Sequence, residues 1–404
     1  MKVVIIGGGP AGMMAAYSSA VDGNQVVLLE KNEKLGKKIY ITGKGRCNLT
    51  CSVEKNDFFA SVVNNPKFLF SSINALSPQD LVTFFESKGL KLKEERGKRI
   101  FPASDKASDV TKTLEKTLIS LGVDIRLYTN VLDVIAENNQ IVGVKTELGI
   151  IDCQKVIVCC GGVSYPTTGS TGDGYKFAKK FGHAVISPKP ALVGIELKGS
   201  DYALLQGLSL KNVSISVFNQ SKLLYSDFGE MLFTHYGVSG PIVLSCSSII
   251  NKQNIDNLTV SIDLKPALTE QVLEQRLIRE FAGNNTKNIT TAIRSLMPKS
   301  LIDVVLSKAN VSTKKNCSQN TVEERNRLIK TLKGLPFSLK KLRPIEEAII
   351  TSGGIDVKQI NPKTMESKLV KGLYFAGEVI DVDAFTGGFN LQIAFSTGYV
   401  AGKN

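Results

Sequence analysis

The sequence predicts an α/β fold in which a Rossmann-like domain is interrupted by an inserted β domain and a helical cap. Three observations lead to this expectation. The chain opens with a buried-strand pattern that runs directly into a glycine fingerprint. It closes with another strand, a glycine pair and a helix-forming run. Between these ends, strand patterns and helix patterns follow one another in blocks, as expected for an insertion.

The first glycine loop follows the strand KVVII and precedes a helix of small residues, MMAAYSSA. Gly7, Gly9 and Gly12 have the G-x-G-x-x-G spacing, which serves a tight turn, a close approach to a pyrophosphate and close helix packing, respectively. The helix start offers free N–H groups to phosphates. The next strand, QVVLL, ends in Glu30, which can accept both ribose hydroxyls of an adenosine. The loop therefore predicts a dinucleotide site, and on these residues both NAD and FAD remain open.

A second segment near the end of the chain favours FAD, because FAD is long and its flavin must be held far from the adenosine. GLYFA is a strand pattern, Gly377 and Glu378 close it, and Gly387 to Asn390 open a helix. Glu378 can bind ribityl hydroxyls. A helix start aimed at the flavin would stabilise the negative charge that forms on reduction. The alternative is a terminal strand and helix that merely complete a sheet.

Two internal segments strengthen the FAD interpretation. KKIYITGKGRCNLT, residues 37–50, combines glycines with basic and small polar residues and is suited to wrap a pyrophosphate. KVIVCCGG is a buried strand that ends in the pair Gly161-Gly162, after which Asp173 begins another helix. We therefore expect the two ends of the chain to meet at one ligand.

Several sequence blocks together resemble a bacterial family of FAD-binding oxidoreductases that includes aminoacetone oxidase and the BaiN-type bile-acid reductases. The resemblance covers nearly the whole chain, and the TGDG helix and final GE strand are more distantly similar to fumarate-reductase-type flavoproteins. The blocks are GGGPAG, ITGKGRCNLT, GKRIFPASDKASDV, TGSTGDGY, LFTHYGVSGPIVLS, TSGGIDV and LYFAGEV with TGGFNLQIA.

The resemblance implies a Rossmann-like two-dinucleotide-binding FAD domain interrupted by an insertion. Position by position, it implies FAD contacts at Gly9, Ala11, Glu30, Lys31, Arg46, Asn48, Val131, Gly377, Glu378, Asn390 and Leu391. With the residues of the glycine loops, the expected cofactor site also includes Gly7, Gly12, Gly161, Asp173 and Gly388. Cys51 departs from the family pattern, where a polar residue is expected. The spacing Cys47-x-x-x-Cys51 is not that of the disulfide-reductase flavoproteins, which argues against a redox disulfide.

The expected FAD domain is discontinuous and comprises residues 1–188 plus 345–404. It contains a helical stretch over 67–89, an amphipathic helix over 108–122 capped by Ser108 or Asp109, and alternating strands over 123–147 around an Asn138-Asn139 turn. We expect the inserted β domain at 189–268 and the basic helical cap at 269–344. The insertion contains no second glycine fingerprint, so NADH or NADPH, as a possible electron donor, would bind without a dedicated domain.

Composition and charge limit the classes of function. The chain has 404 residues, of which 43% are apolar and 22% charged, enough for a large core. Its net charge is +13, and the stretch from Lys265 to Arg343 carries sixteen Lys and Arg against six Asp and Glu, a balance of +10. Such a stretch is either a solvated face or a surface for phosphates. The substrate is accordingly expected to be a small molecule or structured RNA, and a phosphate surface would contact ribosomal RNA. Seven cysteines without paired spacing and two histidines predict no metal site, and no apolar run predicts a membrane span, so we expect a cytoplasmic protein.

The expected chemistry is hydride transfer from flavin N5, with the protein orienting the acceptor and supplying a proton. The resemblance implies substrates with conjugated double bonds or amines, and in some relatives uridine of ribosomal RNA. The candidate proton donors are Cys47, Tyr165, His235 and Tyr236. Three hypotheses follow: reduction of a conjugated C=C, with uridine in ribosomal RNA favoured; oxidation or reduction of a small metabolite such as an amino ketone; and RNA binding by a flavin-stabilised protein without catalysis.

Overall fold

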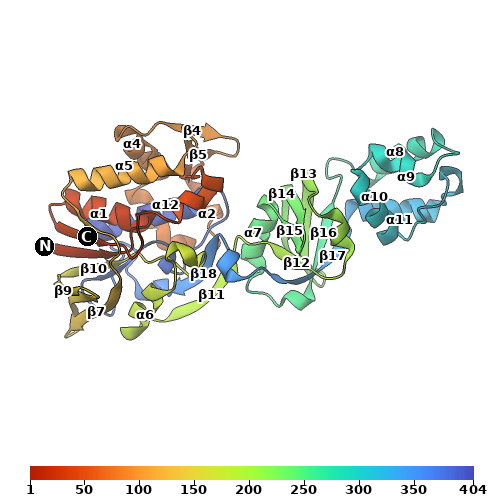
Figure 1. Cartoon of the computed structure of the whole chain (residues 1–404). Coiled ribbons are helices and arrows are strands. Elements are labelled where there is room, and N and C mark those ends of the chain that lie inside the picture. The colour runs from red at the N-terminus through yellow and green to blue at the C-terminus, as the bar shows by residue number, and fades with distance from the viewer. The chain divides into compact units, whose positions relative to one another are not determined.

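The computed structural model describes all 404 residues as two compact units (Figure 1). The first unit comprises Met1–Ala191 and Ile345–Asn404, and the second comprises Leu192–Pro344. The chain thus leaves the first unit once and returns to it once. No helix is both long enough and apolar enough to cross a bilayer.

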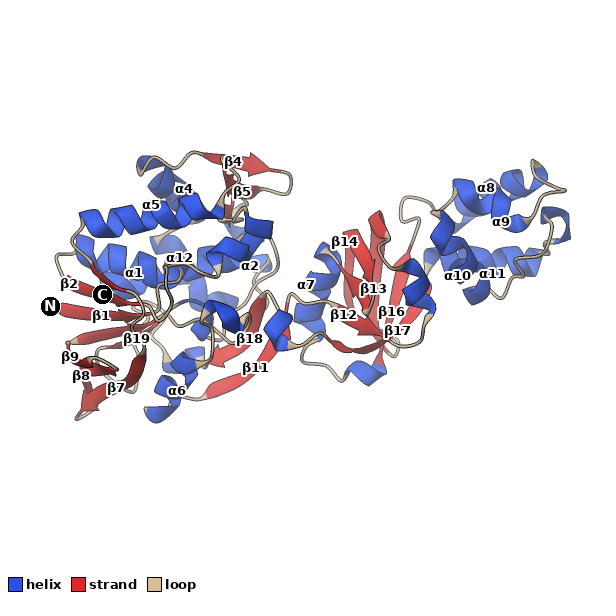
Figure 2. Ribbon diagram, viewed as in Figure 1, coloured by secondary structure: helices blue, strands red, loops and turns tan.

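The first unit is built on a parallel sheet of five strands in the order β19–β10–β1–β2–β6. Helices α1, α5 and α12 cover one face, and a three-stranded meander lies on the other (Figure 2). Strands β1, β10 and β19 are apolar and buried apart from Lys2, which is half-buried, and Lys155, which is buried. This is the pattern of a sheet covered on both faces. The bounds are β1 Lys2–Ile6, β2 Gln25–Leu29, β6 Asp124–Arg126, β10 Lys155–Val158, β19 Leu373–Phe375, α1 Pro10–Val21, α5 Ala107–Ser120 and α12 Phe389–Lys403.

Helix α12 packs directly on α1, which joins the two ends of the chain. A Cβ on Gly398 would lie 2.2 Å from the carbonyl oxygen of Ala11, and a Cβ on Gly402 would lie 2.2 Å from that of Ala15. These two glycines are one helical turn apart, so only residues without a side chain allow the two backbones to approach so closely. The two ends of the chain therefore pack against each other, and their meeting at one ligand stays a prediction.

The remaining elements of the first unit surround the sheet. The meander turns at Asn138 and Asn139, whose φ angles are +47° and +58°, values that Asn tolerates well. The short sheet β3–β5–β4 and the antiparallel pair β11–β18 complete the strands. The bounds are β3 Thr50–Cys51, β4 Leu92–Glu95, β5 Arg99–Pro102, β7 Val131–Glu137, β8 Gln140–Thr146, β9 Gly149–Asp152, β11 Val185–Ala191, β18 Ile350–Ile355, α2 Lys55–Ala60, α3 Phe70–Ala75, α4 Pro78–Ser87 and α6 Asp173–Lys180.

Three local expectations differ from the structure. Helix α5 begins after Lys106, so Ser108 and Asp109 lie in its first turn and neither is the cap. The helical stretch over 67–89 is broken before α4, where Ser77 forms a capping box with Asp80. Strand β6 does not join the meander; it pairs in parallel with β2, because that edge of the central sheet is otherwise open.

The second unit is a closed barrel, β12–β15–β14–β13–β16–β17, with helix α7 and a helical module α8–α11. One hydrophobic core joins barrel and helices. The bounds are β12 Ile195–Leu197, β13 Ser209–Asn219, β14 Lys222–Thr234, β15 Gly237–Ser239, β16 Leu258–Asp263, β17 Leu335–Leu342, α7 Pro241–Ile250, α8 Glu270–Ala282, α9 Ile289–Ala292, α10 Lys299–Lys308 and α11 Val322–Lys333.

Strand β17 lies within the segment 269–344 that we expected to be a helical cap. Its residues Leu335, Phe337 and Leu339 are buried and alternate with exposed ones, which is the pattern of a strand. The helical module is therefore an excursion between two barrel strands, β16 and β17, rather than a terminal addition to the barrel.

Burial of one lysine predicts a pH dependence of stability. Lys155 is 2% exposed, with its ammonium 4.2 Å from the centre of the Tyr374 ring and 3.4 Å from the carbonyl oxygen of Gly402. Burial lowers the pKa of Lys155 from 10.5 to about 8, although Glu366 and Asp22 act in the opposite direction. Between these two values the unfolded chain binds the proton more than the folded chain does, so this residue makes stability rise with pH.

We expect the Lys155→Met variant to lose this dependence. Relative to the variant, the free energy of unfolding of the wild type should rise by up to about 3 kcal/mol between pH 8 and 10.5, following the size of the pKa difference. Urea unfolding of both proteins across this range measures the difference. If the free energies of unfolding of wild type and Lys155→Met changed with pH in parallel, the Lys155 ammonium would not be desolvated in the folded protein.

Candidate functional site

The first glycine loop lies at the point where the order of the central sheet reverses. From β1 the chain goes to β2 on one side and later to β10 on the other, and ligands of open α/β sheets bind beside the carboxyl ends of such strands. Gly7 has a φ of +104°, and a Cβ there would lie 2.6 Å from the carbonyl oxygen of Cys159. A Cβ on Gly12 would lie 1.8 Å from the carbonyl oxygen of Gly7. Both positions therefore require glycine for the turn and for the helix packing.

Gly9 differs from these two glycines because no atom lies within 4 Å of a Cβ built on it. It is the extended N-cap of α1, Pro10 follows at the first position, and the first turn holds no acidic side chain. The open space beside Gly9 and the positive helix end together suit a pyrophosphate. The loop thus fits a dinucleotide.

Glu30 is a buried carboxylate at the carboxyl end of β2. Its Oε2 accepts a hydrogen bond from the backbone N of Gly8 at 2.8 Å, and its Oε1 accepts from the backbone N and Nδ2 of Asn32 at 2.8 and 2.7 Å. A carboxylate offers about four acceptor positions, so one remains on Oε2. The glycine loop and Asn32 fix the orientation of the group expected to bind ribose.

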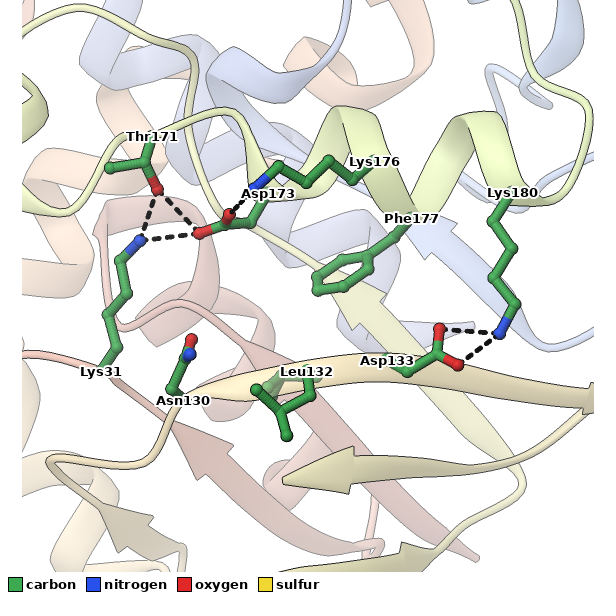
Figure 3. Close-up of a pocket in the computed structure, with 10 residues that line it drawn as sticks. Lys31, Asn130, Leu132, Asp133, Thr171, Asp173, Lys176, Phe177 and Lys180 are labelled. Carbon is green, nitrogen blue, oxygen red and sulfur yellow. Dashed lines mark hydrogen bonds and ion pairs between the residues drawn. The ribbon is translucent and has the colours of Figure 1, made fainter. Parts of the chain in front are cut away.

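A pocket of about 450 Å³ is lined by the next residue, Lys31, and lies between the start of β7 and helix α6 (Figure 3). It brings together three of the expected cofactor residues, Lys31, Val131 and Asp173. Lys31 Nζ lies 2.7 Å from Asp173 Oδ2. Burial acts to raise the pKa of Asp173, but hydrogen bonds from Lys31, Thr171 and Lys176 outweigh it and lower the pKa to about 2. The other residues of the lining are Asn130, Leu132, Asp133, Thr171, Lys176, Phe177 and Lys180.

Glu378, the other expected carboxylate, is held by residues from three other segments. Its Oε1 accepts from Ser164 Oγ at 3.0 Å and from the backbone N of Thr351 at 2.8 Å, and its Oε2 accepts from Lys38 Nζ at 3.0 Å. Oε2 therefore keeps an acceptor position for a hydroxyl. The buried hydroxyl of Tyr175 has no hydrogen-bond partner in the protein; burial raises its pKa, and the charge of Glu378 is the second cause. This phenol is a donor available to a bound group.

The start of α12 joins several of the expected residues. Gly388 is the N-cap, with a φ of +95°, and a Cβ there would lie 2.4 Å from the carbonyl oxygen of Thr50. With its amide oriented to satisfy both bonds, Asn48 accepts from the backbone N of Gly388 and donates to the carbonyl oxygen of Thr50. Asn390 accepts from the backbone N of Ala384 at 2.9 Å and donates to its carbonyl oxygen at 2.8 Å. These amides shape the loop before the helix.

The remaining expected cofactor residues occupy four different places. Gly377 follows β19, and a Cβ on it would lie 2.8 Å from the Cβ of Ala11 in α1. Gly161 follows β10, and Leu391 is partly buried in the first turn of α12. Arg46 pairs with Glu95 and Asp105, and its guanidinium lies 4.4 Å from the centre of the Phe101 ring. The structure does not bring Arg46 to Glu30 or to Glu378.

The candidate proton donors differ in burial. Cys47 is fully buried, and burial raises the pKa of its thiol to about 12, so it holds its proton tightly. Tyr165 is partly exposed and has a φ of +47°. His235 and Tyr236 belong to the second unit, where His235 is exposed and its ring nitrogens have no partner in the protein. The other histidine, His183, is buried with both nitrogens bonded, to Ala178 and Ser367.

Sequence reasoning missed Lys38, Ser164, Thr351 and Asn32 as site residues. Lys38 lies in the basic stretch 37–50, and Ser164 and Thr351 follow or lie within glycine-rich blocks, so their neighbourhoods carried a signal. Their roles depend on contacts between segments that are up to 340 residues apart, as between Lys38 and Glu378.

Comparison with known proteins places the chain among Rossmann-type proteins. The family model described as HI0933-like protein Rossmann domain matches residues 1–404. A 3-dehydro-bile acid delta(4,6)-reductase of Clostridium scindens is 30% identical, with 100% of this chain and 98% of that protein aligned. A ribosomal RNA dihydrouridine synthase of Haemophilus influenzae is also 30% identical, over 98% of this chain and 96% of that protein. A solved 3-ketosteroid delta1-dehydrogenase of Sterolibacterium denitrificans, 12% identical, shares the fold over 99% of this chain and 98% of its own, with a TM-score of 0.54.

The contrast between Gly9 and Gly12 gives a test of the site. Gly9→Val fills open space, so it should cost no more than about 1 kcal/mol of stability at the helix cap while weakening FAD binding at least about tenfold. Gly12→Ala forces a contact with the Gly7 carbonyl and should destabilise the fold by about 1–3 kcal/mol or more.

Thermal unfolding and FAD titration by flavin fluorescence separate these two effects. If Gly9→Val bound FAD as the wild type does, the pyrophosphate would not lie beside this glycine.

Proposed function

The chain belongs to the HI0933-like Rossmann-domain family of flavin-dependent oxidoreductases, and we propose that it reduces a conjugated C=C bond, with uridine in ribosomal RNA as the favoured substrate. The observation that carries this proposal is the joint site formed by the two ends of the chain. One end of this site contains Glu30 and the open space beside Gly9. The other end contains Glu378 and the start of α12. We infer that it works in the cytoplasm, where ribosomes are found.

FAD supplies hydride transfer through its N5 when it is bound. We expect Glu30 to bind the ribose and the N-terminus of α1 to bind the pyrophosphate. Glu378 keeps one acceptor position for a ribityl hydroxyl, and Lys38 balances its charge. NADH or NADPH is the electron donor we propose.

Two full-length relatives support reduction of a double bond. A delta(4,6)-reductase and a dihydrouridine synthase both saturate C=C bonds, one in a steroid-like ring and one in a nucleobase. Uracil C5=C6 is conjugated to a carbonyl, as an enone is. The same reaction serves both substrates: hydride is added to the β carbon, and a proton is added to the carbon next to the carbonyl.

His235 is the proton donor that we favour. It is exposed and its imidazole nitrogens are not used within the protein, whereas both nitrogens of His183 serve the fold. Tyr165 is the second candidate. Cys47 is the weakest, because burial raises the pKa of its thiol to about 12 and leaves it inaccessible to a substrate.

The charge of the helical module supports an RNA substrate. Several of its cations are paired within the second unit, as Lys315 is with Glu324 and Lys333 is with Asp263. Six others are exposed and have no side-chain partner, whereas only two acids of the module, Glu270 and Asp303, are exposed and unpaired. A surface with this excess attracts phosphates. The six cations are Arg279, Lys287, Arg294, Lys299, Lys314 and Lys330.

Reduction or oxidation of a small metabolite, such as an amino ketone, is the second candidate function. It is favoured by the bile-acid reductase relative, which is as similar as the RNA-modifying one. Rapid reoxidation by oxygen and turnover of free amines would support it.

Loss of the gene should abolish a dihydrouridine of ribosomal RNA, because the proposed reaction is the reduction that converts uridine to dihydrouridine. Mass spectrometry of nucleosides from deletion and parent cells measures this modification. Wild-type protein should restore it, Gly9→Val should not, and His235→Gln should restore it at least about tenfold more slowly. Equal dihydrouridine content in deletion and parent cells would remove the RNA claim while leaving reduction of a small substrate open.

Removing four cations of the helical module should weaken RNA binding and reduce its dependence on salt. For Arg279, Arg294, Lys299 and Lys330 changed to Gln, the slope of log K against log salt should fall by about 0.7–0.9 for each lost phosphate contact. A matched variant changes the exposed Lys91, Lys112, Lys116 and Lys145 of the first unit to Gln. Equal RNA affinity in the two variants would assign binding to another surface.

A further inference from the structure

Side chains tie two distant loops together at the adenosine end of the site. Lys31 Nζ donates to Thr171 Oγ1 at 2.6 Å and pairs with Asp173 Oδ2 at 2.7 Å. Next to it, Asn32 Nδ2 donates to the carbonyl oxygen of Thr168 at 3.1 Å. A Cβ on Gly169 would lie 2.5 Å from the same Nδ2, so the loop before α6 approaches the segment after β2 closely.

Of these residues, Lys31, Thr171 and Asp173 form a wall of the pocket of about 450 Å³ (Figure 3). The opposite wall is the start of β7, so the pocket is bounded by three separate parts of the chain. Lys31 is the only one of its lining residues that comes from the segment after β2, and its side chain reaches across to α6. Because Lys31 directly follows Glu30, a nucleoside held by Glu30 lies beside this link.

We propose that Lys31, Thr171 and Asp173 form a clasp that closes over the adenosine half of bound FAD, slows its release and favours FAD over FMN. This inference rests on the proposed function, because it requires FAD in the site. Lys31 acts here as a positioning residue. FMN lacks an adenosine, so the clasp should contribute nothing to FMN binding.

The clasp is an ion pair whose charges are stable near neutral pH. The hydrogen bonds that hold the pKa of Asp173 at about 2 against the effect of burial keep its carboxylate ionised. The side chains of Lys31 and Asp173 are 28% and 24% exposed, so dissolved ions reach the pair. Salt, rather than pH, should therefore loosen the clasp.

Lys31 can be truncated without leaving a buried charge alone. Asp173 Oδ2 still accepts from Thr171 Oγ1 at 2.8 Å, and Oδ1 still accepts from Lys176 Nζ at 3.1 Å. The Asn32 link is unchanged. Lys31→Met should therefore fold normally. Lys112→Met, at an exposed position of α5 with no side-chain partner, is a control with the same change of net charge.

The test measures release of FAD from the loaded full-length chain, followed by the rise of flavin fluorescence on dilution. Lys31→Met should release FAD about tenfold faster than wild type, as expected for loss of a charge-assisted bond. Added salt should speed release from wild type and have little effect on the variant. Lys31→Met with Asp173→Asn should release FAD no faster than Lys31→Met alone, because the two residues act as one unit.

The affinity for FMN separates the clasp from a general loosening of the site, since it should be the same in wild type and Lys31→Met. Equal FAD release from Lys31→Met and Lys112→Met would overturn the clasp while leaving the flavin function intact. If Lys31→Met weakened the binding of FMN and of FAD equally, the clasp would not act on the adenosine half of FAD. A wild-type chain that binds no flavin would instead contradict the proposed function itself.

Discussion

The contact of helix α12 on helix α1 is the constraint on which the rest of the first unit depends. Gly398 and Gly402 let the last helix lie against the backbone of Ala11 and Ala15, in the helix that begins the chain. This contact also brings Gly377 against Ala11, so the residues before α12 are placed beside the first glycine loop. Two segments that could each complete a sheet on their own are therefore brought together, as the proposed FAD site requires.

Two carboxylates organise the candidate site. Protein donors occupy most of the hydrogen-bond acceptor positions of each one. Glu30 is fixed by Gly8 and Asn32, and Glu378 is fixed by Ser164, Thr351 and Lys38. The orientation of both carboxylates is therefore fixed before any ligand binds. The entropy of ordering these side chains is lost on folding rather than on binding. The proposed clasp between Lys31 and Asp173 joins two loops that are far apart in the chain.

Charge is distributed unevenly between the two units. In the first unit, Lys31 and Lys38 pair with carboxylates that shape the site, while other lysines, such as Lys112, are exposed and scattered. The helical module of the second unit leaves six exposed cations without partners. Because long-range attraction depends on unpaired charge, the module is the part of this protein suited to capture a polyanion, and the first unit is the part suited to position a cofactor.

The sequence alone determined the fold class, the glycine loop with Glu30, the final strand and helix with Glu378, and the basic character of the insertion. These features are local: a strand pattern, a turn that needs glycine, or a count of charges is visible in adjacent residues. Only the tertiary structure decided that β17 returns to the barrel, that β6 joins the central sheet and that Lys106 precedes α5. It also decided that Lys38 reaches Glu378 and that Lys31 reaches Asp173, because such partners are chosen by packing between segments far apart in the chain.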